Sequence, residues 1–456
     1  MSIHTEILRA CMVDPFRVAV IDDRRKYKSI ELVVGALHMA TQIEKHCKAP
    51  HVGIMLPTSG AFPIAALGAW LAGKVIVPLN YLLEKEQLQY IVDDAGLDTI
   101  IAADALLEHI GYEPEVESIV RMDKLSFKGF PKLRWPKKAA DDLAMLLYTS
   151  GTSGKPKGVM LSHGNIVTNV RQCIEHAGLH HGQTMLGVLP QFHTFGMTAL
   201  TLLPLIKRLT VIYSARFVPQ KIVKLFREHK PYFFVGIPSM YNALLRVKDA
   251  KPSDFAETVF LVSGGEPLPD AVAANFRERF DKTISEGFGM TESSPVTNLC
   301  RPQEHKPHSV GPALPRIHQR IVDVETGEDL PPNQDGELRT AGPNIMKGYY
   351  KLPDETAAAF DEKGYLRTGD MARIDDDGHL FITGRIKEMI IVGGENVFPR
   401  EIEEVLIRHP AVHDAGVVGC PCEIRGEFPV AFVELAEGHE GTEQNELRQF
   451  CRENLA

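Results

Sequence analysis

Hydrophobic residues in the first 300 positions occur in two kinds of segment, which alternate along the chain. Compact apolar runs such as 52–56 and 75–78 predict buried strands. Stretches such as 30–46 and 84–95 carry apolar residues at helical spacing and predict amphipathic helices. Strands that alternate with helices indicate parallel or mixed sheets covered by helices. The same reasoning predicts further strands at 17–21, 143–147, 185–189, 210–213, 233–235 and 258–262, and helices at 62–72, 166–174, 198–205, 219–229 and 239–247.

Beyond Gly311 the segments become shorter and turns become more frequent. Short runs at 317–324, 336–340 and 378–383, separated by turns such as Thr326–Glu328, predict a small antiparallel β unit. After Gly384 the chain restarts with a strand, an acidic helix and two more strands, at 389–392, 400–408, 412–418 and 428–435.

These patterns predict an α/β protein with a large and a small domain. The large domain, residues 1–383, is expected to contain α/β subdomains at about 1–180 and 181–310 and a β-rich subdomain at about 311–383. The small C-terminal domain, residues 384–456, is expected to be α+β. A chain of 456 residues is too long for one ordinary core, which favours this division.

The composition, with 44% hydrophobic and 24% charged residues, is typical of a globular protein. The formal net charge of −9 argues against nucleic acid as a main partner, although a basic, proline-bearing connector occurs at 131–138. Seven scattered cysteines indicate reduced thiols and a cytoplasmic location. The longest apolar run, 198–206, is too short to cross a bilayer, and residues 1–13 lack a signal core. The sequence is compatible with a peripheral membrane contact and leaves the oligomeric state open.

One stretch carries a dense set of anion-binding groups. Residues 148–158 contain four Ser/Thr hydroxyls, three glycines and two lysines. Glycines allow backbone N–H groups to approach an oxyanion, hydroxyls donate hydrogen bonds, and lysines supply charge. The Walker spacing is absent, so this is not an ordinary P-loop. The alternative is a solvated Gly/Ser linker.

The order Tyr-Thr-Ser-Gly-Thr-Ser-Gly-Lys-Pro-Lys-Gly at 148–158 resembles the phosphate loop of the adenylate-forming superfamily, which includes acyl-CoA synthetases, peptide-synthetase adenylation domains and beetle luciferases. The resemblance extends over nearly the whole chain. It implies that the loop binds ATP and that Thr149 and Lys155 take part in catalysis. The implied ATP-binding residues here are Thr149, Ser150, Gly151, Thr152, Ser153, Gly154, Lys155 and Lys157.

Two further loops resemble nucleotide-binding motifs of this superfamily. In Gly287–Glu292, the resemblance implies that Phe288 lies against adenine, Thr291 donates to the α-phosphate and Glu292 binds Mg²⁺, with Thr291 and Glu292 catalytic. A Thr-Glu pair is also a common helix cap, which is the structural alternative. The other residues implied to contact the nucleotide are Gly264, Gly265, Glu266, Pro267, Gly287, Gly289 and Met290.

The resemblance continues toward the C-terminus. It implies that Asp370 accepts the ribose hydroxyls, with Ile382 beside the nucleotide, and that Arg385 reaches ribose and phosphate as a catalytic residue. Lys387 stands at the superfamily's hinge, about which the small domain is expected to rotate between two half-reactions. The loop implied to line the tunnel of the acceptor thiol, CoA, includes Gly393, Gly394 and Glu395.

The stretch around His193 bears on the substrate. Peptide-synthetase adenylation domains carry an aspartate near this position to pair with a substrate amino group, whereas 192–196 contains no acid. An amino acid substrate is therefore disfavoured. A lone histidine among aromatic residues is ordinarily a packed core residue, but here the resemblance implies a border of the acyl pocket. The pocket residues implied are His193, Phe195, Gly196, Gly236, Met290 and Pro295.

Together these motifs predict an ATP-dependent acyl-CoA synthetase that resembles medium- or long-chain fatty acid ligases. We expect it to form acyl-AMP with release of pyrophosphate and then acyl-CoA, using ATP, Mg²⁺ and CoA. One alternative is an acyl-AMP ligase or acyl-carrier-protein synthetase with a different acceptor. Another, from a different class, is a non-catalytic protein that binds acyl-adenylate.

The C-terminal end lacks one feature of the superfamily, a Pro-x-x-x-x-Gly-Lys segment whose lysine bridges the acyl carboxylate and the α-phosphate. Here Lys387 is the last lysine, and a helical stripe of apolar residues from Leu447 to Leu455 stops without a terminator. We therefore expect this chain, with its truncated C-terminal domain, to be a fragment of a longer protein that binds ATP but adenylates slowly.

Overall fold

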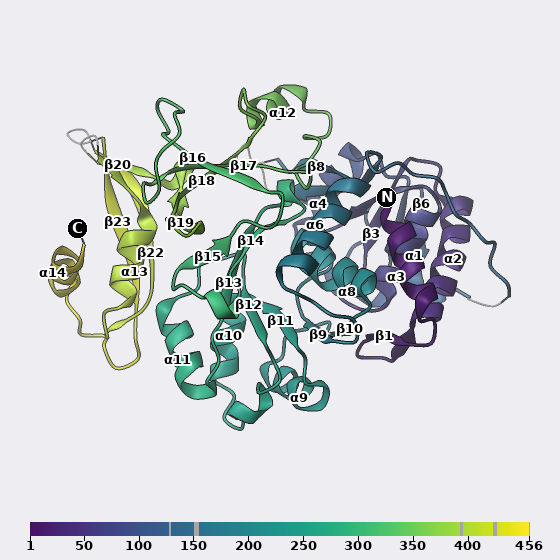
Figure 1. The fold of residues 1–456 in the computed structure, drawn as a ribbon, viewed down its shortest axis with the longest axis horizontal. Coiled ribbons are helices and arrows are strands. Elements are labelled where there is room, and N and C mark those ends of the chain that lie inside the picture. The colour runs from purple at the N-terminus through teal and green to yellow at the C-terminus, as the bar shows by residue number, and fades with distance from the viewer. Residues whose placement is uncertain (127–128, 150–154, 393–394, 423–425, 456) are drawn as a thin grey trace.

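The computed structural model describes residues 1–126, 129–149, 155–392, 395–422 and 426–455. These residues form four sheets (Figure 1). The first has the strand order β6-β5-β3-β4-β7-β8 and is parallel except for β8, which pairs antiparallel with β7. Its strands are β3 (His51–Met55), β4 (Val75–Pro78), β5 (Thr99–Ala102), β6 (Ser118–Arg121), β7 (Leu143–Thr149) and β8 (Lys157–Ser162). The helices of this region are α2 (Ser29–His46), α3 (Ala61–Leu71), α4 (Lys85–Asp94) and α5 (Asp104–Ile110).

The second sheet has eight strands in the order β14-β13-β12-β11-β9-β10-β1-β2, with antiparallel pairs at both edges. Its strands are β1 (Val18–Ile21), β2 (Lys26–Lys28), β9 (Thr184–Gly187), β10 (Thr210–Tyr213), β11 (Phe233–Gly236), β12 (Phe260–Ser263), β13 (Ser285–Gly289) and β14 (Val296–Leu299). The associated helices are α1 (Ile3–Val13), α6 (His163–His176), α7 (Thr194–Met197), α8 (Leu203–Lys207), α9 (Pro219–His229), α10 (Pro238–Leu245) and α11 (Asp270–Phe280).

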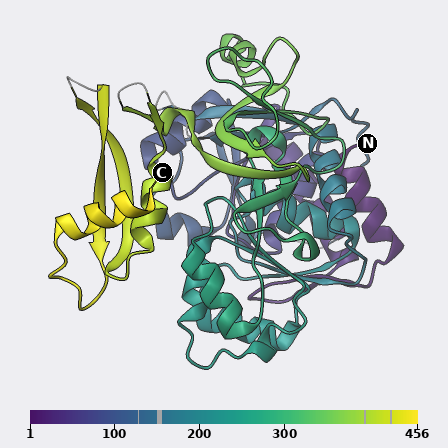
Figure 2. The same ribbon diagram turned by 60° about the vertical axis from the view of Figure 1, so that its left-hand side comes forward.

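The third and fourth sheets are antiparallel and follow in sequence. The third contains β15 (Ser309–Pro312), β16 (His318–Val322), β17 (Gly336–Ala341), β18 (Leu366–Ile374) and β19 (His379–Arg385), with α12 (Pro353–Ala359) beside it. The C-terminal sheet stands apart from the rest (Figure 2). It contains β20 (Ile390–Val392), β21 (Glu395–Val397), β22 (Val412–Cys422) and β23 (Gly426–Leu435), with helices α13 (Pro399–Ile407) and α14 (Gln444–Asn454).

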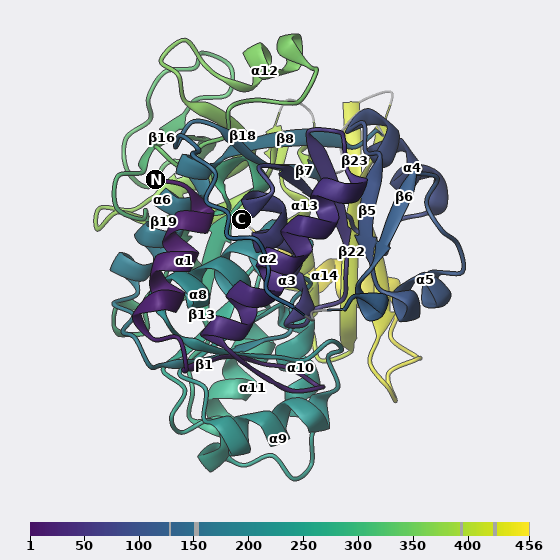
Figure 3. The same cartoon turned by 90° about the vertical axis from the view of Figure 1, so that its right-hand side faces the viewer.

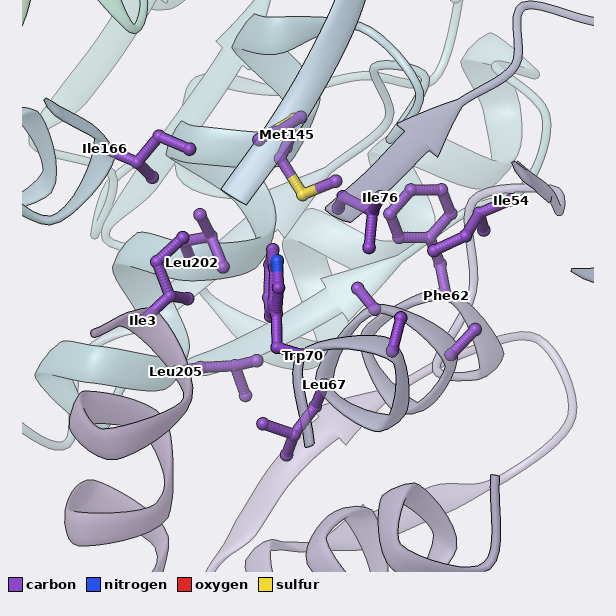
Figure 4. Close-up of a cluster of buried hydrophobic side chains, with 14 of the residues drawn as sticks. Ile3, Ile54, Phe62, Leu67, Trp70, Ile76, Met145, Ile166, Leu202 and Leu205 are labelled. Carbon is purple, nitrogen blue, oxygen red and sulfur yellow. The ribbon is translucent and has the colours of Figure 1, made fainter. Parts of the chain in front are cut away.

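The main core is a cluster of apolar side chains between the first two sheets and the helices that cover them (Figure 4). Trp70 of α3 lies at its centre and is 1% exposed. Its indole nitrogen donates to the Ala144 carbonyl oxygen at 3.0 Å, which satisfies the one polar atom of the ring. Figure 3 shows α1, α2 and α3 over this side of the molecule. No helix among the described residues is long and apolar enough to cross a membrane.

The α/β fold class predicted from the sequence, with a large N-terminal part and a small C-terminal one, is confirmed. Some elements were not predicted. Residues 157–162 form β8, so the glycine-rich loop joins two antiparallel strands rather than a strand and a helix. Residues 366–374, interpreted only as a motif, form β18. β2 was not predicted either; it pairs with β1, which corresponds to the strand predicted at 17–21, and the two complete the second sheet.

Candidate active site

A cleft of about 900 Å³ lies between the large part of the molecule and the C-terminal sheet. Its walls come from the second, third and fourth sheets, so residues far apart in the sequence share one space. Ten residues predicted to bind nucleotide or to act as the hinge line it: Gly265, Glu266, Pro267, Gly287, Phe288, Gly289, Asp370, Ile382, Arg385 and Lys387.

Asp370 and Arg385 are cross-strand partners in β18 and β19. The Arg385 Nε atom lies 3.0 Å from the Asp370 Oδ1 atom, and the Asp370 side chain is 3% exposed. The other carboxylate oxygen, Oδ2, is buried without a hydrogen-bond partner among the described residues. Burial raises the pKa of Asp370 to about 6, although the Arg385 charge acts in the opposite direction. An unsatisfied buried acceptor is costly, so this oxygen fits a ligand hydroxyl such as those of ribose.

Glu292 is oriented by a tyrosine from a distant segment. The Tyr349 hydroxyl donates to the Glu292 Oε1 atom at 2.9 Å. Beside it, the Thr194 hydroxyl donates to the Thr291 hydroxyl at 3.1 Å. Among the described residues no group of three metal-ligating side chains occurs. Mg²⁺ at nucleotide sites uses one or two carboxylates and the substrate phosphates, so a single oriented glutamate fits this ion.

The glycine-rich loop is described only at its two ends. Thr149 is the last residue of β7. Lys155 is exposed, and its Nζ atom lies 5.6 Å from the centre of the Tyr90 ring. Lys157 instead forms an ion pair with Glu355 of α12. Five predicted ligands lie outside the described residues: Ser150, Gly151, Thr152, Ser153 and Gly154.

Close packing of the backbone explains one of the predicted glycines, and backbone conformation explains another. A Cβ atom on Gly289 would lie 2.2 Å from the Pro295 carbonyl oxygen, which no side chain can tolerate. Gly265 has a φ of 87°, a left-handed conformation that favours glycine. Both glycines line the cleft, so they keep backbone close to any ligand bound there.

A second, apolar cavity of about 100 Å³ shares four lining residues with the cleft, Gly265 and Gly287–Gly289, and therefore lies next to it. It extends between β9, β11 and β12 on one side and helical segments on the other. None of its lining side chains among the described residues is Asp, Glu, Lys or Arg. The apolar lining comes mainly from Cys173, Ala177, Leu179, Met185, Ala199, Leu203, Phe233, Val235, Val262 and Leu299.

Four of the six residues predicted to form the acyl pocket line this cavity: His193, Phe195, Met290 and Pro295. Gly196 and Gly236 are not among its described lining residues. A Cβ atom on Gly196 would lie 2.0 Å from the Pro190 carbonyl oxygen, so this glycine permits a tight turn behind the wall. Gly236, at the end of β11, packs against the Phe234 and Tyr241 rings.

One wall of the cavity is a π-helical turn, Thr198–Leu202, within a segment that the sequence predicts as regular helix. Hydroxyl groups hold this turn in place. Thr201 donates to the Gly196 carbonyl oxygen five residues earlier, at 3.2 Å, and Thr198 donates to the Ser294 carbonyl oxygen at 3.1 Å. Such turns often occur at functional sites, and here Ala199 of the turn lines the cavity.

The remaining predicted residues lie on the connection to the C-terminal sheet. Lys387 is in a short 3-10 turn, Ile386–Glu388, that joins β19 to β20. Gly393 and Gly394 lie outside the described residues, and Glu395 begins β21. Their assignment to a hinge and a thiol tunnel stays a prediction.

Sequence reasoning missed the partners that orient predicted residues. Tyr349 donates a hydrogen bond to Glu292, which lies 57 positions earlier in the sequence, and Glu355 forms an ion pair with Lys157. No local pattern marks either residue, since the contacts arise only because 346–350 runs beside β8.

Comparison with known proteins identifies the class. Residues 8–350 match the family described as AMP-binding enzyme, and residues 401–456 match the AMP-binding enzyme C-terminal domain. The chain is 31% identical to the long-chain-fatty-acid–CoA ligase of Bacillus subtilis (strain 168), over 97% of this chain and 87% of that protein. It is 30% identical to 4-coumarate-CoA ligase 1 of Narcissus pseudonarcissus, over 100% and 86%. The chain belongs to the AMP-binding, or adenylate-forming, enzyme family.

Solved structures agree with this. ATP-bound MatB from Rhodopseudomonas palustris superposes with a TM-score of 0.89 and 28% identity, over 100% of this chain and 93% of that one. The o-succinylbenzoate CoA synthetase from Bacillus subtilis, in complex with its acyl-adenylate intermediate, gives a TM-score of 0.88 and 28% identity, over 99% and 92%. These similarities support an adenylate-forming CoA ligase that uses ATP and CoA.

Proposed function

We propose that the protein activates an apolar carboxylic acid, specifically a fatty acid, to acyl-AMP and transfers the acyl group to CoA. The observation that carries this proposal is the apolar cavity, whose described lining has no Asp, Glu, Lys or Arg and which shares lining residues with the cleft that contains Asp370. An apolar chain gains about 25 cal/mol per Å² on leaving water. A substrate ammonium group in the same cavity would lose its hydration without gaining a carboxylate partner.

In the first half-reaction, a carboxylate oxygen of the acid attacks the α-phosphorus of ATP, and the bond to pyrophosphate breaks. Asp370 accepts hydrogen bonds from the ribose, and Arg385 places positive charge beside it. Thr291 donates to the α-phosphate, where charge develops. Glu292 would hold Mg²⁺, which would neutralise phosphate charge. Thr149 and Lys155, at the two ends of the glycine-rich loop, would supply a hydroxyl group and a positive charge to the phosphates that leave.

In the second half-reaction, the sulfur of CoA attacks the acyl carbonyl carbon, the thiol loses its proton, and AMP leaves. The segment 393–395 would guide the pantetheine chain, after rotation of the C-terminal sheet about Lys387. This part of the proposal rests on the sequence motifs.

Pyrophosphate release with a panel of acids, each with and without CoA, tests the proposal. We expect release with fatty acids of medium or long chain, thioester formation only when CoA is present, and background rates with α-amino acids. Robust release with an amino acid would contradict the proposal. Pyrophosphate release without thioester in the presence of CoA would instead indicate a different acceptor, such as an acyl-carrier protein.

A second substrate class has support of its own, because relatives that match most of the chain include 4-coumarate–CoA ligases. An aromatic acid also suits a cavity lined by Phe195 and Phe233. A higher kcat/KM for 4-coumarate than for every fatty acid in the panel would replace the fatty acid assignment by an aryl one.

A further inference from the structure

A segment with positive charge and exposed apolar side chains lies away from the cleft. Residues 124–140 contain five lysines, one arginine and no acidic residue, in a chain with a net charge of −9. We call residues 129–138 of this segment the basic connector. Within it Phe130 is fully exposed, Leu133 is 90% exposed and Trp135 is 59% exposed. Lys132 and Lys137 are exposed beside them.

This exposure is unusual for the molecule. The other tryptophan, Trp70, is 1% exposed at the centre of the core. Single exposed apolar residues are normal on protein surfaces, but three large ones within six positions are typical of a surface that meets an apolar partner.

The basic connector is held on the surface by two contacts. Arg134 forms an ion pair with Glu44 of α2. The Pro136 carbonyl oxygen lies 3.0 Å from the His4 Nε2 atom, within hydrogen-bond distance. Figure 1 shows α2, which supplies Glu44, at the opposite end of the molecule from the C-terminal sheet. The connector is therefore presented outward at a defined place.

We propose that the basic connector docks on the surface of an anionic lipid bilayer. Tryptophan and phenylalanine favour the headgroup region, where a ring can be buried while polar atoms stay hydrated. Lysines in the same segment would neutralise anionic headgroups, which attract basic residues near a membrane surface. Leu133 argues against a nucleic acid partner, because an aliphatic side chain gains free energy from an apolar phase but does not stack on bases.

The distribution of tryptophans provides a direct test. Because Trp70 is buried and donates to Ala144, a change in emission on adding vesicles reports on Trp135. The full chain is titrated with vesicles of phosphatidylcholine alone and with vesicles of equal parts phosphatidylcholine and phosphatidylglycerol. We expect a blue shift and co-sedimentation with the anionic vesicles only. Raising the salt from about 0.1 M to about 0.5 M should weaken binding, because it shortens the screening length.

Charge and apolar variants separate the two contributions. Lys132→Glu with Lys137→Glu should weaken vesicle binding at least about tenfold, since each basic residue near the surface contributes about fivefold. Leu133→Ser should weaken binding while keeping the charge. Matched controls are Arg448→Glu with Arg452→Glu on α14 and Phe432→Ser on β23, all exposed and in the C-terminal domain. The controls should bind vesicles as the unchanged protein does.

All variants should have the same melting temperature as the unchanged protein. With a water-soluble acid as substrate, they should also release pyrophosphate at the same rate. Equal binding to neutral and anionic vesicles, or equal loss in the α14 controls, would overturn the proposal. Binding to a polyanion such as heparin without binding to anionic vesicles would also overturn it, in favour of a nucleic acid or another polyanion. Since the vesicle assay needs no turnover, its result is independent of the proposed function.

Discussion

In the ligand-free protein, the buried carboxylate of Asp370 is expected to lower the stability of the fold. One of its carboxylate oxygens is buried without a donor among the described residues, and Arg385 contacts only the other. The same features suit a nucleotide, because ribose hydroxyls would supply the missing donors. Burial raises the pKa of this carboxyl to about 6, so its charge changes within an accessible pH range.

ATP affinity should therefore fall when the pH drops below about 6. Protonation of Asp370 in the free protein removes an acceptor, so binding at pH 5 should be about tenfold weaker than at pH 7. Calorimetric titration with ATP measures this. The Asp370→Asn variant should bind ATP weakly, and its affinity should change little between pH 5 and pH 7. The unchanged protein should likewise show little pH dependence with 2′,3′-dideoxy-ATP, which lacks the ribose hydroxyls. An unaltered pH profile in Asp370→Asn would assign the titration to another group.

Glu292 and Tyr349 define a second residue-scale test. Glu292→Gln should lower acyl-AMP formation by about a hundredfold to a thousandfold, equivalent to roughly 2.7–4 kcal/mol of barrier, with a nearly unchanged melting temperature. Tyr349→Phe removes only the orienting hydroxyl and should cost about tenfold or less. Pyrophosphate release and thermal melts measure both. A large loss of folding in Glu292→Gln, with normal specific activity of the folded fraction, would mean that Glu292 is structural.

At the scale of elements, the acyl cavity depends on how helical segments approach the second sheet. The C-terminal end of α6 supplies Cys173 and, at its cap, Ala177. The π-helical turn supplies Ala199, a small side chain that leaves space. The side chains at these positions are small, and larger side chains there would fill the cavity.

Filling this space should change chain-length preference. Ala177→Phe adds a ring to the cavity wall and should lower kcat/KM for long fatty acids more than for short ones. Insertion of extra volume costs about 1–3 kcal/mol of stability, so the melting temperature should fall modestly. Exposed Val259→Phe, outside the cavity lining, is the control. A uniform loss of activity across chain lengths would show that the wall does not contact the acyl chain.

At the scale of the whole molecule, the C-terminal sheet has its own small core. Ile390, Leu406, Val412, Val417 and Leu447 form a buried cluster separate from the main one. A unit with few apolar contacts of its own is expected to open independently of a large core.

Leu447→Ala should therefore destabilise the C-terminal unit by roughly 2–4 kcal/mol without unfolding the rest. Hydrogen exchange followed by mass spectrometry should show faster exchange in 399–455 and unchanged protection in β3, β4 and β9. The neighbouring surface change Arg448→Ala should leave both regions as they are. Faster exchange throughout the chain would mean that the two parts unfold as one unit.

The sequence by itself determined the local elements and the chemistry of the motifs. Strands such as β3 and β4 follow from compact apolar runs, because a buried strand needs apolar side chains on both faces. The helix α9 begins and ends at the predicted residues, since its apolar positions recur at helical spacing. The glycine-rich loop and Gly287–Glu292 are predicted to bind nucleotide because their residue order resembles that of the adenylate-forming superfamily.

Only the tertiary structure decided which of these residues meet. The pairing of Asp370 with Arg385 depends on the register of β18 and β19, and the bond from Tyr349 to Glu292 depends on a segment beside β8. β1 joins the second sheet through parallel pairing with β10, and β2 joins it through antiparallel pairing with β1, which no local pattern specifies. Side-chain periodicity reports which face of an element is buried, whereas sheet order and register are set by packing of the whole chain. The position of the site therefore follows from long-range contacts.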